Sequence, residues 1–116
     1  MIRALVPMAH VQDVSRSIAF YEKLGFRAAN VFTPQGATEP SWASVQSDRA
    51  ELMVARGEKS SGSVLFYLYC DDVSRERERL QAAGIRVGEI TYAFYAPRGE
   101  FRVEDPDGYV LMITHT

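Results

Sequence analysis

The 116-residue sequence has one cysteine, little net charge and no long apolar run, and each of these absences limits where the protein can act. Its one cysteine, Cys70, excludes an intramolecular disulfide, and we expect it to be a buried structural thiol. The formal net charge of −2 gives no electrostatic basis for binding nucleic acid or an anionic membrane surface. No apolar run approaches the ~18–20 residues that span a bilayer, and the N-terminus shows no secretion signal. We therefore expect a cytoplasmic protein without nucleic-acid or membrane partners.

Motifs for common catalytic chemistry are also missing. Neither of the two histidines lies near Cys70 in the sequence, which argues against an activated thiol nucleophile. The sequence contains no glycine-rich phosphate loop of the P-loop or dinucleotide type. Paired carboxylates occur only in "CDD" at 70–72 and "EDPDG" at 104–108, where helix capping and turn formation account for them. The sequence therefore predicts no catalytic residue.

The chain contains an internal repeat. The letters "DVSR" occur at 13–16 and again at 72–75, an offset of 59 residues. The same offset, without a gap, aligns further pairs: Gly25 with Gly84, Leu52 with Leu111, and Met53 with Met112. A constant offset indicates a duplicated supersecondary unit, and two copies are too few for a solenoid. We predict a single domain over 1–116, made of module 1 at 1–57, a polar joint at 58–62 and module 2 at 63–116.

Both halves show the same order of predicted elements. Each begins with a strand-like segment and continues into a helix, with Asp13 or Asp72 as N-cap and Gly25 or Gly84 just past the C-terminus. Three further strands follow in each half, at 26–33, 41–46 and 50–56 in the first and at 85–92, 100–104 and 109–114 in the second. The order is βαβββ, twice. "DPDG" at 105–108 predicts a tight hairpin turn.

The first strand of the second half shows two distinct faces. One face is apolar, while the other combines apolar side chains with tyrosine hydroxyls and consists of Leu65, Tyr67 and Tyr69. This pattern suits a sheet with a helix behind it and a ligand cavity in front. A plain core is the alternative.

Four stretches together resemble the vicinal oxygen chelate superfamily: "HVQDVSRSIAFYEKLGF", Trp42 followed by "AELMVA", "YLYCDDVSRERERLQAAGI" and "FRVEDPDGYVLMI". That superfamily includes glyoxalase I, fosfomycin-resistance enzymes, extradiol dioxygenases and bleomycin-resistance proteins. The resemblance covers almost the whole chain. It implies an α+β fold in which two tandem βαβββ modules form a curved, cup-shaped mixed sheet with the helices outside. It specifies the fold more than the function, because this scaffold carries several activities.

The resemblance also indicates where a metal would bind. Enzymes of the superfamily hold a divalent metal in the cup, with one ligand from the first strand and one from the last strand of each module. Motif alignment places these positions at Val6, Met53, Leu65 and Met112. Aliphatic side chains coordinate nothing, and a thioether is a weak, soft ligand suited mainly to copper(I). We therefore expect no metal and no other cofactor.

Two other interpretations stay open. In the first, His10, Glu51 and His115 act as displaced ligands, and the chain is a metal-dependent lyase, isomerase or dioxygenase. A metal needs three or four ligands that converge on one point, which this set does not readily supply. In the second, the interior is a closed apolar core without any ligand, and the surface serves oligomerisation only.

Counting residues across each predicted hairpin gives the cross-strand pairs that line the predicted ligand site. If "DPDG" closes a four-residue loop, Glu104 pairs with Tyr109 and Met112 lies opposite Phe101; the same arithmetic sets Met53 opposite Trp42. The cup would then be lined by Val6, Trp42, Met53, Leu65, Tyr67, Phe101 and Met112. This lining suits a flat aromatic or largely apolar molecule. We predict metal-independent sequestration of such a molecule, for example an antibiotic, as in the bleomycin-resistance branch.

The loop at 91–99 adds further aromatic side chains. It carries Tyr92, Phe94 and Tyr95, and Arg98 could meet a carboxylate of the ligand. An exposed aromatic loop could equally belong to a subunit interface. Metal-free members that resemble this chain bind ligands in crevices shared by two subunits, so the resemblance implies a homodimer.

Overall fold

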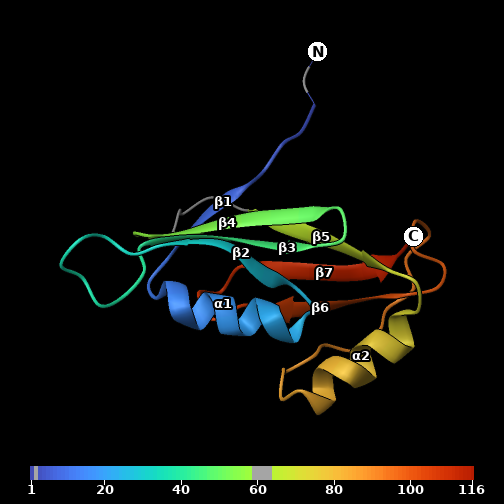
Figure 1. Cartoon of the computed structure of the whole chain (residues 1–116). Coiled ribbons are helices and arrows are strands. Elements are labelled where there is room, and N and C mark those ends of the chain that lie inside the picture. Colours follow the sequence, from blue (N-terminus) through green and yellow to red (C-terminus); the bar gives the residue numbers. More distant parts are fainter. Residues whose placement is uncertain (2, 59–63) are drawn as a thin grey trace. The chain divides into compact units, whose positions relative to one another are not determined.

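The computed structural model describes residues 1, 3–58 and 64–116, and its contacts divide the chain into two compact units, Met1–Ser61 and Gly62–Thr116. Each unit has one sheet and one helix, which is the mixed α+β fold that the repeat predicts (Figure 1). Apart from Glu58, the predicted joint at 58–62 lies outside the described residues. The single domain over 1–116 and the exact module bounds stay predictions.

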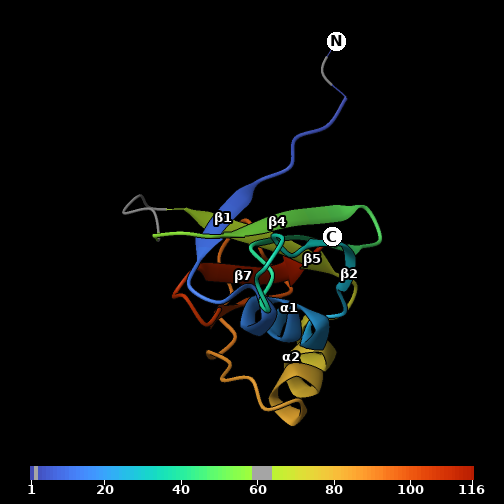
Figure 2. The ribbon, with the colours of Figure 1, turned by 60° about the vertical axis from the view of Figure 1, so that its left-hand side comes forward.

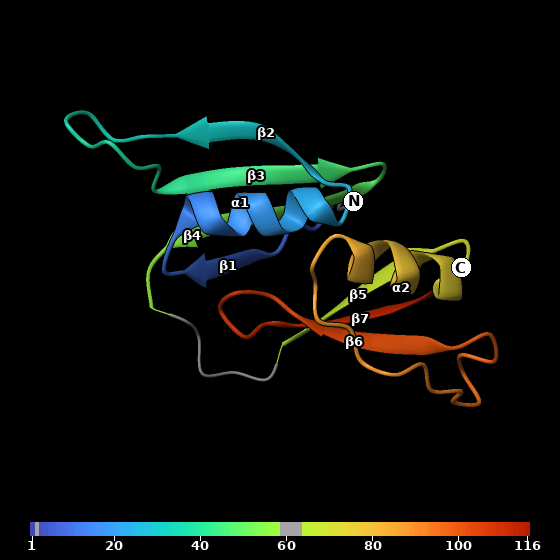
Figure 3. The ribbon, with the colours of Figure 1, turned by 90° about the horizontal axis from the view of Figure 1, so that it is seen from below.

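Unit 1 has four strands and one helix, in the predicted order. They are β1 (Met8–Val11), α1 (Val14–Lys23), β2 (Arg27–Phe32), β3 (Trp42–Ser47) and β4 (Ala50–Arg56). The strand order in the sheet is β1-β4-β3-β2, with β1 parallel to β4 and the other pairs antiparallel. Helix α1 packs against β2, β3 and β4 and lies along this sheet in Figure 3. The strand β1 begins only at Met8, because the chain before it runs away from the sheet and leaves Leu5 85% exposed (Figure 2).

The described part of unit 2, residues 64–116, has three strands and one helix. They are β5 (Leu65–Cys70), α2 (Val73–Ala82), β6 (Glu100–Glu104) and β7 (Val110–His115). The strand order is β5-β7-β6, with β5 parallel and β6 antiparallel to β7. Helix α2 packs against β6 and β7.

Both helices begin and end at the predicted residues. The Asp13 carboxylate accepts a hydrogen bond from the Arg16 backbone N–H at 3.1 Å, and Asp72 accepts one from Arg75 at the same distance. These bonds satisfy N–H groups that the first turn of a helix leaves without a partner. After the helices, Gly25 (φ 100°) adopts the left-handed conformation that a helix C-terminus requires, and its counterpart in unit 2 does the same.

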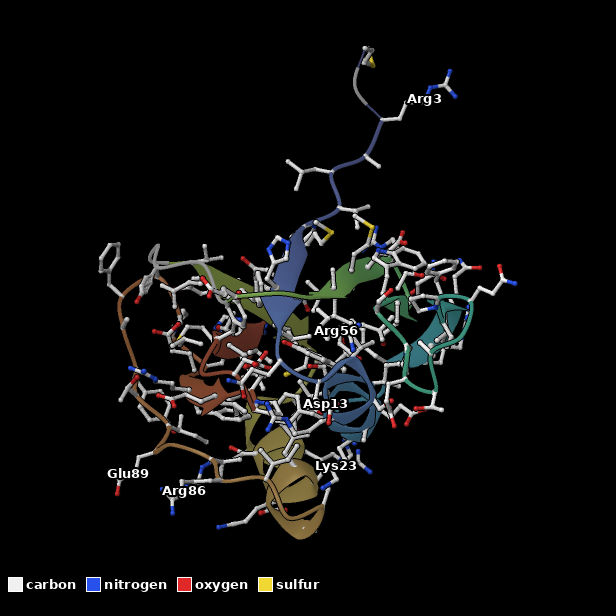
Figure 4. The ribbon with its side chains drawn as sticks, turned by 90° about the vertical axis from the view of Figure 1, so that its left-hand side faces the viewer. Arg3, Asp13, Lys23, Arg56, Arg86 and Glu89 are labelled. Atoms are coloured by element: carbon white, nitrogen blue, oxygen red, sulfur yellow. The ribbon has the colours of Figure 1, made fainter. Side chains whose placement is uncertain are left out.

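The predicted strand at 85–92 is wrong. This segment of unit 2 lies beside β6 but makes only an isolated bridge between Thr91 and Glu100 and one hydrogen bond from the Gly88 N–H to the Arg102 carbonyl, 2.9 Å. The Gly88 carbonyl is instead taken by the Arg77 Nε of α2, at 2.7 Å, so the ladder of strand hydrogen bonds cannot continue. Figure 4 shows the exposed side chains of Arg86 and Glu89 in this segment pointing outward.

Both predicted hairpin registers are also wrong. Met112 pairs with Arg102, and Glu104 pairs with Val110 in place of Tyr109. The cause is Asp105, whose Oδ1 accepts hydrogen bonds from the backbone N–H groups of Asp107 and Tyr109, both at 2.9 Å. This side-chain turn adds one residue to the loop.

In unit 1 the hairpin is tighter. Ser47 pairs with Ala50 around a two-residue turn, in which Asp48 adopts a positive φ of 49°. As a result, Met53 pairs with Ser44 in place of Trp42. Trp42 and Met53 nevertheless share one face of the sheet, because the displacement is two residues.

One face of each sheet is buried. In unit 1 this face packs with Val14 and Tyr21 of α1, and in unit 2 with Val73 and Leu80 of α2, all of them buried. The most buried strand residues on these faces are 0–6% exposed: Ala9, Val11, Ala43, Val45, Leu52 and Val54 in unit 1 and Phe101, Val103, Leu111 and Ile113 in unit 2. Alternation along each strand therefore directs the remaining side chains to the opposite face, away from the helix.

Candidate functional site

The face of the unit 2 sheet opposite α2 is rich in tyrosine, and we call it the tyrosine face. Strand register places these side chains on it: Leu65, Tyr67, Tyr69, Glu100, Arg102, Met112 and Thr114. Leu65 is 54% exposed, Tyr67 45% and Tyr69 64%. The rings of Tyr67 and Tyr69 are stacked, with centroids 6.4 Å apart. Large side chains exposed together on one sheet face supply apolar and aromatic contact area for a ligand.

A buried carboxylate lies at one end of the tyrosine face. Glu100 is 4% exposed, and its Oε1 accepts a hydrogen bond of 2.9 Å from the Tyr95 hydroxyl. Tyr67, on the tyrosine face, lies near Tyr95. The hydrogen bond to Glu100 and the charge of that carboxylate, with smaller contributions from Tyr67, raise the pKa of Tyr95 from 10.0 to about 12. Tyr95 is therefore a protonated hydrogen-bond donor throughout the physiological pH range.

Tyr95 belongs to the predicted aromatic loop at 91–99, which is fixed at its base. Thr91 and Glu100 exchange two backbone hydrogen bonds of 2.9 Å, and the loop contains the buried Ala96. At Gly99 (φ 102°) an added Cβ would lie 2.5 Å from Ile90 Cγ2, so only glycine fits here. Tyr92 and Phe94 on this loop are 68% and 98% exposed.

Arg98 already has partners within the chain. Its backbone N–H donates to His115 Nε2 at 3.1 Å, and its guanidinium lies 2.9 Å from His115 Nδ1 and also donates to the Thr116 carbonyl. The predicted contact of Arg98 with a ligand carboxylate would require these bonds to break. The same bonds occupy His115, one of the considered metal ligands.

Trp42, a predicted ligand contact, lies on the face of the unit 1 sheet opposite α1, which we call the open face. Register places Met8, His10, Phe32, Trp42, Ser44 and Met53 on it. Trp42 and Met53 are half-buried, and Ser44 is 1% exposed with a hydroxyl that has no hydrogen-bond partner. Val6 precedes β1 and is half-buried.

Within each unit, strand register assigns the predicted site residues to a face of the sheet. Leu65, Tyr67 and Met112 share the tyrosine face, and Trp42 and Met53 share the open face of unit 1. Phe101 lies on the opposite, buried face of its sheet and is 1% exposed, which makes it part of the core beside α2.

Sequence reasoning missed Glu100 and the partnership between Glu100 and Tyr95. The available signal was the alternation of Glu100, Arg102 and Glu104 along β6, which puts three charged residues on one face. Neither the burial of Glu100 nor its hydrogen bond from Tyr95 is visible in that pattern.

The donor set does not fit a divalent metal. The four positions that the superfamily resemblance assigns to ligands are held by Val6, Met53, Leu65 and Met112, whose side chains offer at most a thioether. Across residues 1, 3–58 and 64–116, no three His, Cys, Asp or Glu side chains come together as a metal-binding group. His10 and Glu51, the considered alternatives, therefore do not belong to a group of three such side chains among these residues.

Cys70 lies half-buried on the helix side of β5. Burial, reinforced by the charge of Glu76, raises the pKa of its thiol. A raised pKa keeps the thiol protonated at neutral pH, which makes it a poor nucleophile.

Neither α1 nor α2 has the length and apolar character needed to cross a membrane, and they are the helices of the described residues.

The family follows from the fold together with a match to a family model. Residues 5–113 match the model of the Glyoxalase/Bleomycin resistance protein/Dioxygenase superfamily, and the chain belongs to that superfamily. No curated protein sequence matches the chain.

Several solved structures share the fold at low sequence identity. A bleomycin-binding protein complexed with bleomycin is 20% identical, with a TM-score of 0.75 and 99% of each chain covered. TnmS3, an antibiotic-binding protein from Streptomyces sp. CB03234, is 21% identical, with a TM-score of 0.77 and coverage of 99% of this chain and 96% of its own. A glyoxalase-related enzyme from Clostridium phytofermentans is 14% identical, with a TM-score of 0.83 and coverage of 100% and 96%. The likeness extends to binding proteins and to an enzyme, so it defines the fold and not the activity.

Proposed function

We propose that this protein binds a small, largely apolar or aromatic molecule without a metal, and protects by sequestering it, as an antibiotic-binding protein does. The observation that carries the proposal is the replacement of all four expected metal ligands by Val6, Met53, Leu65 and Met112. The loss of ligands leaves apolar side chains where a chelating site would be, and apolar lining with a few polar groups is typical of small-molecule sites.

The tyrosine face supports the proposal from the structural side. Its exposed Leu65 and Tyr67, with Met112 between strands β5 and β6, combine a stacking surface with an adaptable thioether. In unit 1 we propose Val6, Trp42 and Met53 as the corresponding contacts. Bleomycin-binding and antibiotic-binding proteins with the same fold are consistent with this use of the scaffold.

We further propose that the protein is a cytoplasmic homodimer. The support is the exposed aromatic loop, whose Tyr92 and Phe94 project from a fixed base and can contact either a ligand or a second subunit. Sedimentation equilibrium of the wild type and of Phe94→Ser distinguishes the two uses. A dimer weakened by the substitution supports an interface, while an unchanged monomer contradicts the dimer.

The first experiment separates the binding protein from a metal-dependent enzyme. The purified chain is incubated in turn with Ni, Zn, Mn and Fe(II), freed of excess metal, and analysed for bound metal by elemental mass spectrometry. The proposal predicts far less than one equivalent of every metal, followed by thermal-shift hits in a panel of aromatic antibiotics that includes bleomycin. Close to one equivalent, lost in Glu51→Gln, would establish a displaced metal site and the enzymatic alternative.

A further inference from the structure

Glu100 is a buried carboxylate, and one of its two oxygens has no hydrogen-bond partner. The Tyr95 hydroxyl donates to its Oε1 at 2.9 Å, whereas its Oε2 is buried and has no hydrogen-bond partner. Removing a charged oxygen from water without a partner costs free energy, so such a group in a folded protein calls for an explanation, such as an ion or ligand that completes it.

The nearest cations in the sequence do not neutralise this carboxylate. Arg102 lies two residues along β6 on the same face, but its guanidinium pairs with Glu104 at 2.8 Å. The Arg98 guanidinium contacts His115 and the Thr116 carbonyl. Within residues 1, 3–58 and 64–116, no ion pair includes Glu100. The negative charge is therefore available to a cation from outside the chain.

Tyrosine side chains lie near the carboxylate on the tyrosine face. Tyr95 donates a hydrogen bond to it, and Tyr67 lies close enough to Tyr95 to contribute to the rise in its pKa. Tyr69 lies in the same row across the sheet, since both Tyr69 and Glu100 pair with Thr114 of β7. Tyrosine rings attract a cation placed over their faces, and this attraction adds to that of a carboxylate.

The tyrosine side chains near Glu100 are exposed, whereas the Glu100 backbone is held by hydrogen bonds. Tyr67 is 45% exposed and Tyr95 56% exposed, so both rings have room to turn aside. The Glu100 backbone is held by its two hydrogen bonds to Thr91, which keeps the carboxylate in place when the rings turn. A carboxylate that is held in place beside exposed tyrosine side chains is suited to receive a small ligand group.

We propose that Glu100, Tyr67 and Tyr95 form a subsite for the protonated amine of a small molecule whose aromatic or apolar part lies on the tyrosine face. The ammonium donates a hydrogen bond to Glu100 Oε2 and lies against the tyrosine rings. This inference rests on the proposed function, which it narrows from apolar or aromatic molecules to those that carry a cationic amine. The subsite excludes anionic analogues, because the buried carboxylate repels them.

The test uses three probes with the same ring system and different charge: 2-naphthylmethylamine, 2-naphthylmethanol and 2-naphthoate. Dissociation constants at pH 7 are measured by following backbone amide NMR shifts of the wild type, Glu100→Gln and Glu104→Gln. Glu104 is the matched control, because it lies on the same strand and face but is exposed. Circular dichroism confirms that each variant is folded, and Glu100→Asp retains the charge on a shorter side chain.

We expect the amine to bind about tenfold more tightly than the alcohol, with the naphthoate weakest, since a charged contact in a partly desolvated site is worth a factor of this order. Glu100→Gln should reduce the affinity for the amine to that for the alcohol and leave the alcohol unchanged, and Glu104→Gln should change neither. Glu100→Asp should recover part of the preference.

Two results would overturn the subsite. Equal affinities for amine and alcohol, unaffected by Glu100→Gln, would refute it while leaving the apolar-binding proposal intact. Failure of all three probes to bind would refute the subsite together with the proposal that this face holds aromatic ligands.

Discussion

Replacing Glu100 with methionine should stabilise the protein. The carboxylate is 4% exposed and its charge has no cationic partner, so burial costs several kcal/mol even after local relaxation. Against this stands the loss of one hydrogen bond from Tyr95, which contributes less than a buried one because the Tyr95 side chain is exposed to water. Tyr95 is 56% exposed, so its hydroxyl finds water when the carboxylate is removed. The difference favours the variant by about 1 kcal/mol.

Urea unfolding followed by circular dichroism measures this change directly. A gain of about 1 kcal/mol also corresponds to a rise of roughly 4 °C in the melting temperature for a chain of this size. Glu104→Met is the control, because its exposed ion pair with Arg102 contributes only about 0–1 kcal/mol. A loss of 1 kcal/mol or more in Glu100→Met would show that the carboxylate holds the fold together, and the argument for a ligand-binding role would fail. A gain would identify a residue kept at a cost in stability, which is typical of functional sites.

Three further predictions concern the core, the hydrogen bond between Tyr95 and Glu100, and a helix cap. Phe101→Ala should lower the free energy of unfolding by about 3–5 kcal/mol and Tyr67→Ala by no more than about 1, since only Phe101 is buried; equal losses would contradict the assignment of faces. Because folding raises the pKa of Tyr95 to about 12, the protonated phenol stabilises the fold fully below pH 10 and this contribution is lost as the pH rises through 12. Tyrosine ¹³Cζ shifts should show this late titration and its return toward pH 10 in Glu100→Gln; an unchanged titration in the variant would rule out the hydrogen bond as its cause. Asp72→Ala should cost about 1 kcal/mol by removing the N-cap of α2, and equal stability in thermal melts would argue against capping.

The sequence was sufficient for features that depend on local signals. The aspartates at 13 and 72 and the glycines at 25 and 84 define both helices, because capping and the left-handed conformation are properties of single residues. Alternation in "LFYLYC" at 65–70 also assigned the two faces of β5 correctly. These features need no information about distant parts of the chain.

The registers could not be predicted in this way. The gapless repeat suggested one register for both hairpins, yet Asp105 adds a residue to one turn while Asp48 allows a two-residue turn in the other. A shift of one residue moves a side chain to the other face, and this is why Phe101 was placed in the ligand site and found in the core. The length of the turn decides such a shift, and the constant offset of the repeat does not reveal the length of either turn.

Contacts between a side chain and a distant element could not be predicted from the sequence either. The strand predicted at 85–92 is interrupted because Arg77, on a separate helix, takes the carbonyl of Gly88. The hydrogen bond to Glu100 likewise comes from Tyr95, in the loop that precedes β6. Neither contact follows from periodicity, since both are made by a side chain that reaches out of its own element.

The measurement that tests the central claim most directly is a calorimetric titration of 2-naphthylmethylamine into the full chain, first after dialysis against EDTA and then after addition of Zn or Ni. A metal-independent binding protein should give the same affinity and stoichiometry in all samples. Binding that disappears in EDTA and returns with a metal would contradict the account and restore the metal-dependent alternative.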